Sequence, residues 1–337
     1  MDFALSIING QTVSDIIRGN RDECVEIVRG AYLAHASGHS VNPDSHFLRF
    51  PDKPDCRIIA LPAYLGDGFE VAGLKWIASY PGNVQRGIPR ASAVLVLNRC
   101  DTGYPFAILE SSIISAARTA ASATLAAYWL GGRSRRAHSL GIVGTGLIAR
   151  YLYEFLLDTG WAIDEVRLYD RSPVESEKFR NTVCRREQHA AVTVAPDTAE
   201  LVRACDLIVF TTVASTPHVV DPALFEHNPL VLHISLRDLA PEILLRSQNV
   251  VDDVDHVMKA NTSPHLAEQQ TGDRSFVTGT LADIMLGRRS VDRSRPIIFS
   301  PFGMGILDVA VGKWVYDQAV AGGRDMRLAD FFYEVAR

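Results

Sequence analysis

The second half of the chain alternates short apolar runs with helix-length amphipathic stretches, and this alternation constrains the fold most. The apolar runs begin near residue 140 and are nearly continuous, as is typical of strands covered on both faces. The expected strands are LGIV (140–143), EVRLYD (165–170), AVTVA (191–195), DLIVFTT (206–212), LVLHISL (230–236), NVVDDV (249–254) and PIIFSPFG (296–303). The expected helices between them span 148–157, 175–187 and 198–204. Strands joined by crossover helices predict an α/β, Rossmann-type domain with a parallel sheet.

A glycine-rich turn directly follows the first of these strands. The run GTGLIA fits the pattern Gly-x-Gly-x-x-Ala at a strand-to-helix junction, where the glycines permit a tight turn and let a pyrophosphate approach the helix N-terminus. The residues expected to contact a dinucleotide here are Gly144, Thr145, Gly146, Leu147 and Ile148. The alternative is a glycine-tolerant turn without a ligand.

The strand after this turn ends at Asp170, followed by Arg171. A carboxylate about 20 residues beyond the glycines accepts hydrogen bonds from the ribose hydroxyls and repels a 2′-phosphate, so NAD is favoured over NADP. Arg171 could partly neutralise a 2′-phosphate, which would allow NADP. The alternative for Asp170 is a solvated residue at the end of a strand without a ligand. Thr211 and Thr212 are expected near the cofactor ribose, although threonine is also common in strands.

The first 125 residues follow a different pattern, of strands joined by turns. The expected strands are FALSII (3–8), CRIIALPAYL (56–65), EVAGLKWIAS (70–79) and ASAVLVL (91–97), with helices over 21–36 and 111–130. The stretch 305–322 has helical spacing and is expected to return to this part of the chain. We therefore predict an α+β substrate-binding and dimerisation domain of residues 1–125 with 306–337, and a Rossmann dinucleotide-binding domain of residues 126–305.

Composition excludes several other classes of protein. The 337 residues include 34 basic and 39 acidic side chains for a net charge of −5, without the basic block that a nucleic-acid partner would require. The five cysteines are scattered and form no Cys-x-x-Cys pair, so reduced thiols and no metal site are expected. No signal-peptide pattern or membrane-length apolar run is present, which predicts a cytoplasmic protein that does not enter a membrane.

Three cations lie in unusually apolar surroundings in the first half of the sequence. Lys75 is in an apolar strand, Arg90 begins another, and Arg118 lies among small residues of a long helix. A buried cation costs several kcal/mol unless it is paired, so an anionic partner is expected. That partner is either a structural carboxylate, such as Glu110, or the carboxylate of a substrate.

Motifs along nearly the whole chain resemble the ornithine cyclodeaminase/mu-crystallin family. They are GLKWIASYPGN, DTGYPFAILESSIISAARTAASATLAAYWL, GIVGTGLIA, HISLRDLAPE and PFGMGILDVAVGKWVY, in family order. FLRF, RIIALP and RASAVLVLN are most similar to its N-((2S)-2-amino-2-carboxyethyl)-L-glutamate dehydrogenase branch, which makes 2,3-diaminopropionate for siderophores and antibiotics.

The resemblance implies roles for individual residues. Lys75, Arg118 and Arg49 would bind a substrate carboxylate, and Asp238 would be catalytic together with Lys75, although Asp238 also suits a helix N-cap. Cofactor contacts are implied for Ser235, Gly303 and Met304. His233 is expected to be a hydrogen-bonded core residue. His218 is expected in a polar loop, where a histidine needs no functional role.

Two departures from the family pattern bear on the substrate. Cyclodeaminases have an acidic residue before the family proline, where this chain has Ala60, and Arg90 appears in place of a threonine. Loss of a carboxylate and gain of a guanidinium favour a substrate with an additional carboxylate over ornithine. The expected reaction is NAD-dependent oxidative cleavage of the glutamate conjugate to L-2,3-diaminopropionate and 2-oxoglutarate.

Other functions remain open at this stage. They are another amino-acid dehydrogenase or ketimine reductase, a cyclodeaminase, and a non-catalytic nucleotide- or ligand-binding protein. The resemblance further implies a homodimer, and a pathway partner that is a pyridoxal-phosphate-dependent synthase using O-phosphoserine and glutamate.

Overall fold

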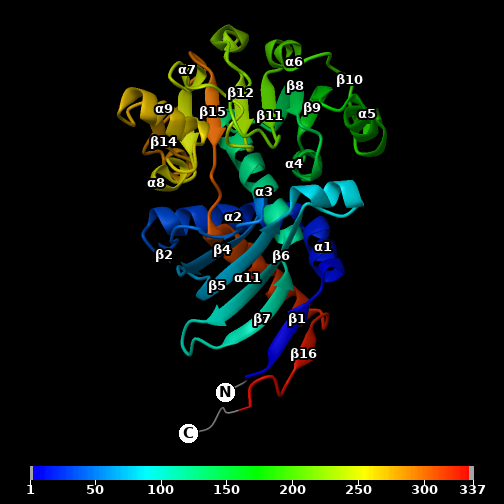
Figure 1. Ribbon diagram of the computed structural model, residues 1–337, viewed down its shortest axis with the longest axis vertical. Helices are drawn as coiled ribbons and strands as arrows, with labels where there is room; N and C mark the ends of the chain where they lie inside the picture. Colours follow the sequence, from blue (N-terminus) through cyan, green and yellow to red (C-terminus); the bar gives the residue numbers. More distant parts are fainter. Residues whose placement is uncertain (1–2, 334–337) are drawn as a thin grey trace. The chain divides into compact units, whose positions relative to one another are not determined.

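The computed structural model describes residues 3–333 and divides into two compact units. One comprises residues 1–118 and 304–337, and the other comprises residues 119–303 (Figure 1). The helix α3 (Ser112–Leu130) contributes to both, because the division falls within it. None of the helices in the described part is both long and apolar enough to cross a membrane.

The second unit is built on a parallel sheet of eight strands. They are β8 (Arg136–Val143), β9 (Ala162–Tyr169), β10 (Ala191–Val194), β11 (Leu207–Phe210), β12 (Leu230–His233), β13 (Gln248–Val251), β14 (Val277–Thr280) and β15 (Ile297–Ser300). Their order is β10-β9-β8-β11-β12-β15-β13-β14. From β8 the chain adds β9 and β10 on one side and β11 and β12 on the other. The boundary between β8 and β11 is therefore the switch point where doubly wound sheets bind ligands. The expected Rossmann fold is confirmed, and β14 is a strand that the sequence pattern did not indicate.

Short helices connect these strands. They are α4 (Leu147–Asp158), α5 (Pro173–Thr182), α6 (Thr198–Ala204), α7 (Pro241–Leu244), α8 (Val254–Val257), α9 (Ser263–Thr271) and α10 (Leu281–Met285). The side chain of Asp197 caps α6 by accepting a hydrogen bond from the N–H of Glu200. The predicted helix over 175–187 was too long, since α5 already ends at Thr182.

The first unit is a mixed sheet covered by helices. Its strands are β1 (Leu5–Ile8), β2 (Ser40–Val41), β3 (His46–Phe50), β4 (Lys53–Leu65), β5 (Val71–Ser79), β6 (Ala91–Arg99), β7 (Pro105–Glu110) and β16 (Met326–Leu328). Their order is β16-β1-β7-β6-β5-β4-β2, with β3 paired to β4. The helices are α1 (Gly10–Gly19), α2 (Arg21–Ala36) and α11 (Gly305–Ala321). Sequence patterns did not indicate α1, β3 or β7.

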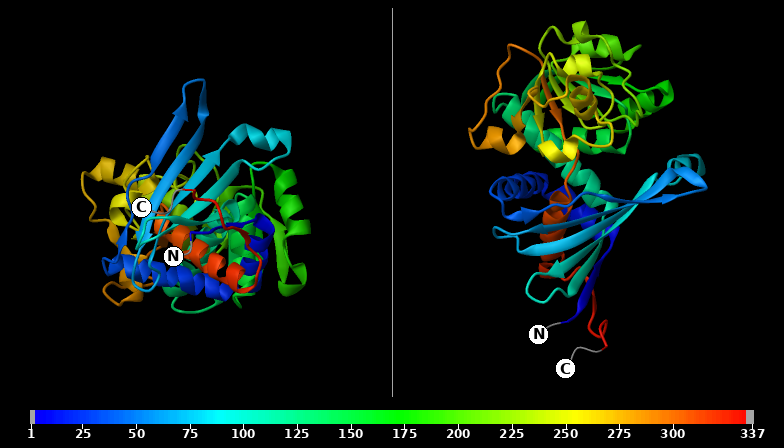
Figure 2. Two further views of the ribbon diagram at one scale, coloured as in Figure 1. Left: turned by 90° about the horizontal axis from the view of Figure 1, so that it is seen from below. Right: turned by 60° about the vertical axis from the view of Figure 1, so that its left-hand side comes forward.

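Helix α11 packs on β4, β5 and β6, along one face of this sheet (Figure 2). The approach is close, because a Cβ at Gly312 would lie 2.1 Å from Leu95 Cδ2. Side chains on the opposite face include Trp76 and Val94, which are paired across β5 and β6 and are 40% and 43% exposed. One face of the sheet therefore forms the core of this unit, and the other presents apolar side chains to the surface.

Candidate functional site

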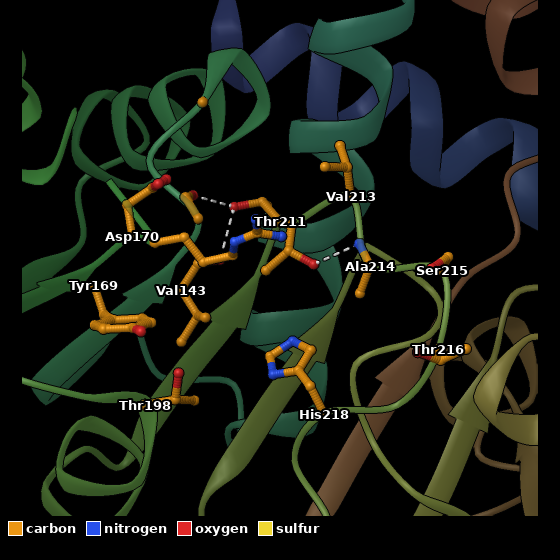
Figure 3. A pocket seen from close by; sticks show the side chains of 14 residues that line it. Val143, Tyr169, Asp170, Thr198, Thr211, Val213, Ala214, Ser215, Thr216 and His218 are labelled. Atoms are coloured by element: carbon orange, nitrogen blue, oxygen red, sulfur yellow. Dashed lines mark hydrogen bonds between the residues drawn. The ribbon is translucent and has the colours of Figure 1, made fainter. Parts of the chain in front are cut away.

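A cavity of about 520 Å³ lies at the switch point of the Rossmann sheet (Figure 3). Its lining comes from the ends of β8, β9 and β11 and from the loop that follows β11. The lining residues are Val143, Gly144, Gly146, Tyr169, Asp170, Arg171, Thr198, Thr211, Thr212, Val213, Ala214, Ser215, Thr216 and His218. The cavity thus collects six of the predicted cofactor residues and His218, a residue to which the sequence reasoning assigned no function.

The glycine turn at the edge of this cavity requires glycine at position 144. Gly144 has φ +88°, and a Cβ there would lie 2.9 Å from the carbonyl group of Thr211. Gly146 precedes the first turn of α4, and a Cβ there would meet no atom within 4 Å. The open backbone at the start of a helix is suited to a phosphate group, whose charge the helix dipole favours. The residues present therefore fit the diphosphate of a dinucleotide.

Asp170 braces this turn from the end of β9. Its carboxylate accepts hydrogen bonds from Thr145 N at 2.9 Å, from Thr145 Oγ1 at 3.2 Å and from Ser172 N at 3.0 Å. A carboxylate has about four acceptor positions, so capacity for a ribose hydroxyl remains. The alternative of a merely solvated strand-end residue is wrong.

Asp252 plays a comparable part for the loop that contains Gly303. Its buried carboxylate accepts hydrogen bonds from Phe302 N at 2.9 Å and from Gly303 N at 2.6 Å. Burial raises the pKa of Asp252 even though these donors oppose the rise. The side chain of Met304, the next residue, is fully buried. Sequence reasoning predicted cofactor contacts for Gly303 and Met304 but missed the carboxylate that shapes the loop.

Asp238 is fully buried behind the lining of the cavity. The hydroxyls of Thr212 and Ser235 both donate short hydrogen bonds to its carboxylate, and His218 Nε2 lies 3.0 Å from Asp238 Oδ1. Burial raises the pKa of Asp238, but the hydrogen bonds from His218 and the other donors outweigh burial and hold it well below its usual range. Asp238 does not cap a helix, because α7 begins only at Pro241, so that alternative is wrong.

The side chain of His233 contacts the backbone of the same aspartate. The N–H of Asp238 donates to His233 Nε2 at 3.1 Å, and His233 Nδ1 lies 3.2 Å from Ser300 Oγ. His233 Nε2 also lies 3.3 Å from Asp238 Oδ2. The expectation of a buried, hydrogen-bonded core residue is confirmed.

The anionic partner of Lys75 and Arg118 is Asp308 on α11. Lys75 Nζ lies 2.7 Å from Asp308 Oδ2, and Arg118 Nε lies 3.3 Å from Asp308 Oδ1. Glu110 is not that partner, because its carboxylate accepts hydrogen bonds from the first backbone N–H groups of α3. Sequence reasoning missed Asp308, although a single acid in the apolar run GILDVAVG was the available signal.

This cluster of Lys75, Arg118 and Asp308 carries one positive charge in excess. Burial lowers the pKa of Lys75 to about 8, and the nearby Asp308 carboxylate limits the fall. The Arg118 side chain is 12% exposed, whereas those of Lys75 and Asp308 are almost fully buried. Arg118 uses Nε for Asp308, and its terminal nitrogens have no hydrogen-bond partner among residues 3–333. They remain available for a carboxylate.

Three further guanidinium groups, which we call the arginine trio, lie at one end of the same sheet. Arg49 and Arg57 are paired across β3 and β4, and Arg57 is also paired with Ser79 of β5. The carbonyl of Arg90 accepts a hydrogen bond from Tyr80, next to Ser79. Burial and the nearby charge of Arg57 both lower the pKa of Arg90. In the part of the chain that the structure describes, no carboxylate pairs with any of the trio.

Arg57 was not among the predicted site residues. Its Nε is buried and lacks a hydrogen-bond partner within the described residues. Because it faces Arg49 across the strand pair, Arg57 belongs with the predicted substrate cations.

The register also corrects the interpretation of Ala60. Lys75 is paired with Leu61, and Ala60 is paired with Trp76, so Ala60 lies on the sheet face opposite Lys75. The β4 residues nearest to Lys75 on its face include Ile59 and Leu61. Both are apolar, so this strand still provides no acid beside Lys75.

One unit has a turn typical of dinucleotide binding, and the other has a cluster of cations. These features are typical of a dinucleotide-dependent protein that binds small carboxylates. Comparison with known proteins then identifies the family: the chain matches the ornithine cyclodeaminase/mu-crystallin family over residues 11–323 and belongs to it.

Individual relatives cover nearly the whole chain. It is 29% identical to an alanine dehydrogenase of Archaeoglobus fulgidus, over 94% of this chain and 95% of the relative. It is 28% identical to the N-((2S)-2-amino-2-carboxyethyl)-L-glutamate dehydrogenase of Staphylococcus aureus, over 89% of this chain and 91% of the relative. An archaeal alanine dehydrogenase, solved as a dimer with bound NAD, superposes with a TM-score of 0.86 at 28% identity, over 98% of this chain and all of the other.

We expect Asp308→Asn to lower the free energy of unfolding by about 3–5 kcal/mol, because it leaves two buried cations without their charge partner. Urea denaturation followed by circular dichroism measures this change. Asp317→Asn is the matched control on the same helix, since Asp317 forms an exposed pair with Lys313 and should contribute less than about 1 kcal/mol. Equal effects of the two substitutions would contradict a structural role for the Asp308 cluster.

Proposed function

We propose that this protein is an NAD-dependent oxidoreductase that cleaves N-((2S)-2-amino-2-carboxyethyl)-L-glutamate. The products are L-2,3-diaminopropionate, 2-oxoglutarate and NADH. The braced glycine turn and the ribose-side carboxylate of Asp170 support NAD as the cofactor. Siderophore or antibiotic assembly, as the pathway served, stays a prediction.

The observation that carries this proposal is the excess of unpaired positive charge in the first unit. The Asp308 cluster has one net positive charge, and the arginine trio adds three guanidinium groups without carboxylate partners in the described chain. Clustered like charges repel one another, which an anionic ligand relieves. The conjugate has three carboxylates, and guanidinium groups bind carboxylates with a matched pair of hydrogen bonds.

The charge distribution weighs against smaller or cationic substrates. Alanine has one carboxylate, which the Asp308 cluster alone would satisfy, leaving the trio without a function. Ornithine would bring an ammonium group towards unpaired arginines, and neither Ile59 nor Leu61 supplies an acid to neutralise it. A three-carboxylate amine is therefore the substrate that uses most of the observed groups.

The proposed division of roles follows from the same geometry. Arg118 binds one carboxylate through its terminal nitrogens, supported by Lys75, and the trio binds the others. These contacts fix the orientation of the glutamyl Cα. When bound, the nicotinamide ring accepts a hydride from that carbon, so the amine becomes an imine, which water then hydrolyses. Asp238 supports that hydrolysis through its contact with His218.

Purified protein incubated with NAD and the conjugate should form NADH and 2-oxoglutarate in a 1:1 ratio. Absorbance at the NADH band and a coupled 2-oxoglutarate assay measure the two products. NADH from alanine but not from the conjugate would instead establish an alanine dehydrogenase, and proline from ornithine without net NADH would establish a cyclodeaminase.

Arg57→Ala and Arg90→Ala should each raise KM for the conjugate by about 10- to 100-fold, because a charge-assisted hydrogen bond contributes about 1.5–3 kcal/mol. Initial rates across a range of conjugate concentrations provide the test, with NAD saturating. Arg86→Ala is the control, since Arg86 is an exposed cation at the end of the neighbouring turn (Pro81–Arg86). An unchanged KM in both variants would refute a carboxylate role for the trio.

We further propose that a second copy of the chain covers the exposed apolar face of the first sheet, as suits the predicted homodimer. Leu48, Trp76 and Val94 on this face are 40–47% exposed. Trp76→Asp should therefore shift the sedimentation coefficient from dimer to monomer, whereas Val84→Asp, at an exposed valine outside the sheet, should not. A monomeric unmodified protein at micromolar concentration would exclude this dimer.

A further inference from the structure

His218 connects the buried Asp238 to the nucleotide cavity. Its side chain lines the cavity (Figure 3). It is 40% exposed, whereas the side chain of Asp238 has no exposed surface. His218 Nε2 lies 3.0 Å from Asp238 Oδ1. The backbone is tied as well, because the N–H groups of His218 and Val219 both donate to the carbonyl of Asp238, at 3.0 and 2.9 Å. The ring is therefore held in place rather than left to a free loop.

The contacts of Asp238 determine which nitrogen of His218 carries the proton. A carboxylate that is ionised only accepts hydrogen bonds, so the neutral His218 ring has its proton on Nε2. His218 Nδ1 then has a free lone pair, and it makes no hydrogen bond to any residue from 3 to 333. A buried aspartate that orients a histidine through one ring nitrogen, leaving the other free to accept a proton, is an arrangement suited to general base catalysis.

Asp238 itself is poorly suited to accept a proton. Thr212, Ser235 and His218 already donate to its two oxygens. A proton on the carboxylate would have to displace one of these donors, whereas a proton on His218 Nδ1 would create a cation beside an ionised carboxylate, which stabilises it. The ring nitrogen of His218 is thus the proton acceptor beside Asp238, and its neighbouring ionisable groups are Asp238 and, behind it, His233.

We propose that His218 is the general acid–base residue of this site and that Asp238 is its positioning residue, an assignment that rests on the proposed function. Water adds to the protonated imine carbon, and His218 Nδ1 takes one proton from that water. His218 passes this proton to the amine nitrogen. It then takes the remaining hydroxyl proton as the C=O bond forms and the C–N bond breaks, and passes that second proton to the leaving amine. One iminium ion and one water thus give one 2-oxoglutarate and one diaminopropionate ammonium group, with protons and charge balanced.

His218→Gln tests this role, because the glutamine amide can still donate to Asp238 but cannot accept a proton. In a single turnover with NAD and the conjugate, we expect NADH formation within about threefold of the unmodified rate and 2-oxoglutarate release at least about 100-fold slower. The accumulated imine should be trapped by cyanoborohydride. NAD affinity, measured by fluorescence titration, should stay within about threefold.

The matched control is His138→Gln, which alters an exposed histidine paired with Asp164 at 3.2 Å in the same unit and should change none of these quantities. Histidine ¹⁵N resonances, assigned by their loss in His218→Gln, give a readout without substrate. We expect a ring protonated at Nε2 that loses this preference in Asp238→Asn. Unchanged resonances in Asp238→Asn, or normal 2-oxoglutarate release by His218→Gln, would overturn the assignment alone. Absence of NADH from the conjugate with the unmodified protein would overturn the proposed function and this role with it.

Discussion

The first unit depends on the ion pairs that the buried carboxylate of Asp308 forms with two cations. It joins Lys75 of β5 and Arg118 of α3 to α11, three elements that are far apart in the sequence. This pairing gives a physical reason for the C-terminal helix to return to the N-terminal sheet, in addition to the close packing at Gly312. Because two cations share one carboxylate, the pairing that stabilises the fold also leaves one positive charge for a ligand.

Local signals predicted the Rossmann unit well. Each of its expected strands is present, and the turn at Gly144 has the positive φ that glycine there indicated. These features depend on residues close together in the sequence, whose spacing is read directly. The partner of Lys75 depends on a contact across 233 positions. Glu110 was the nearer acid, but its position just before α3 commits it to capping that helix.

Strand register explains the other differences. Side chains alternate between the two faces of a sheet, so an error of one residue moves a side chain to the opposite face. The pairing of Leu61 with Lys75 and of Arg49 with Arg57 is set by turns whose geometry the sequence did not reveal. The sequence therefore did not show that Ala60 and Lys75 lie on opposite faces, and Arg57 was overlooked although it lies in the same strand as Ala60.

The hydrogen bonds of the polar groups distinguish residues that hold the structure together from residues that are available to a ligand. Asp170, Asp252 and Asp308 each accept hydrogen bonds from groups of their own unit, and so does Asp238. These carboxylates hold loops and helices in place, and their oxygens already accept hydrogen bonds from the protein. Among the described site residues, free hydrogen-bonding capacity remains at the terminal nitrogens of Arg118, at the arginine trio and at one ring nitrogen of His218. Cationic donors together with a single neutral proton acceptor are what the hydrolysis of an imine that bears several carboxylates requires, because the donors bind the anion and the acceptor activates water.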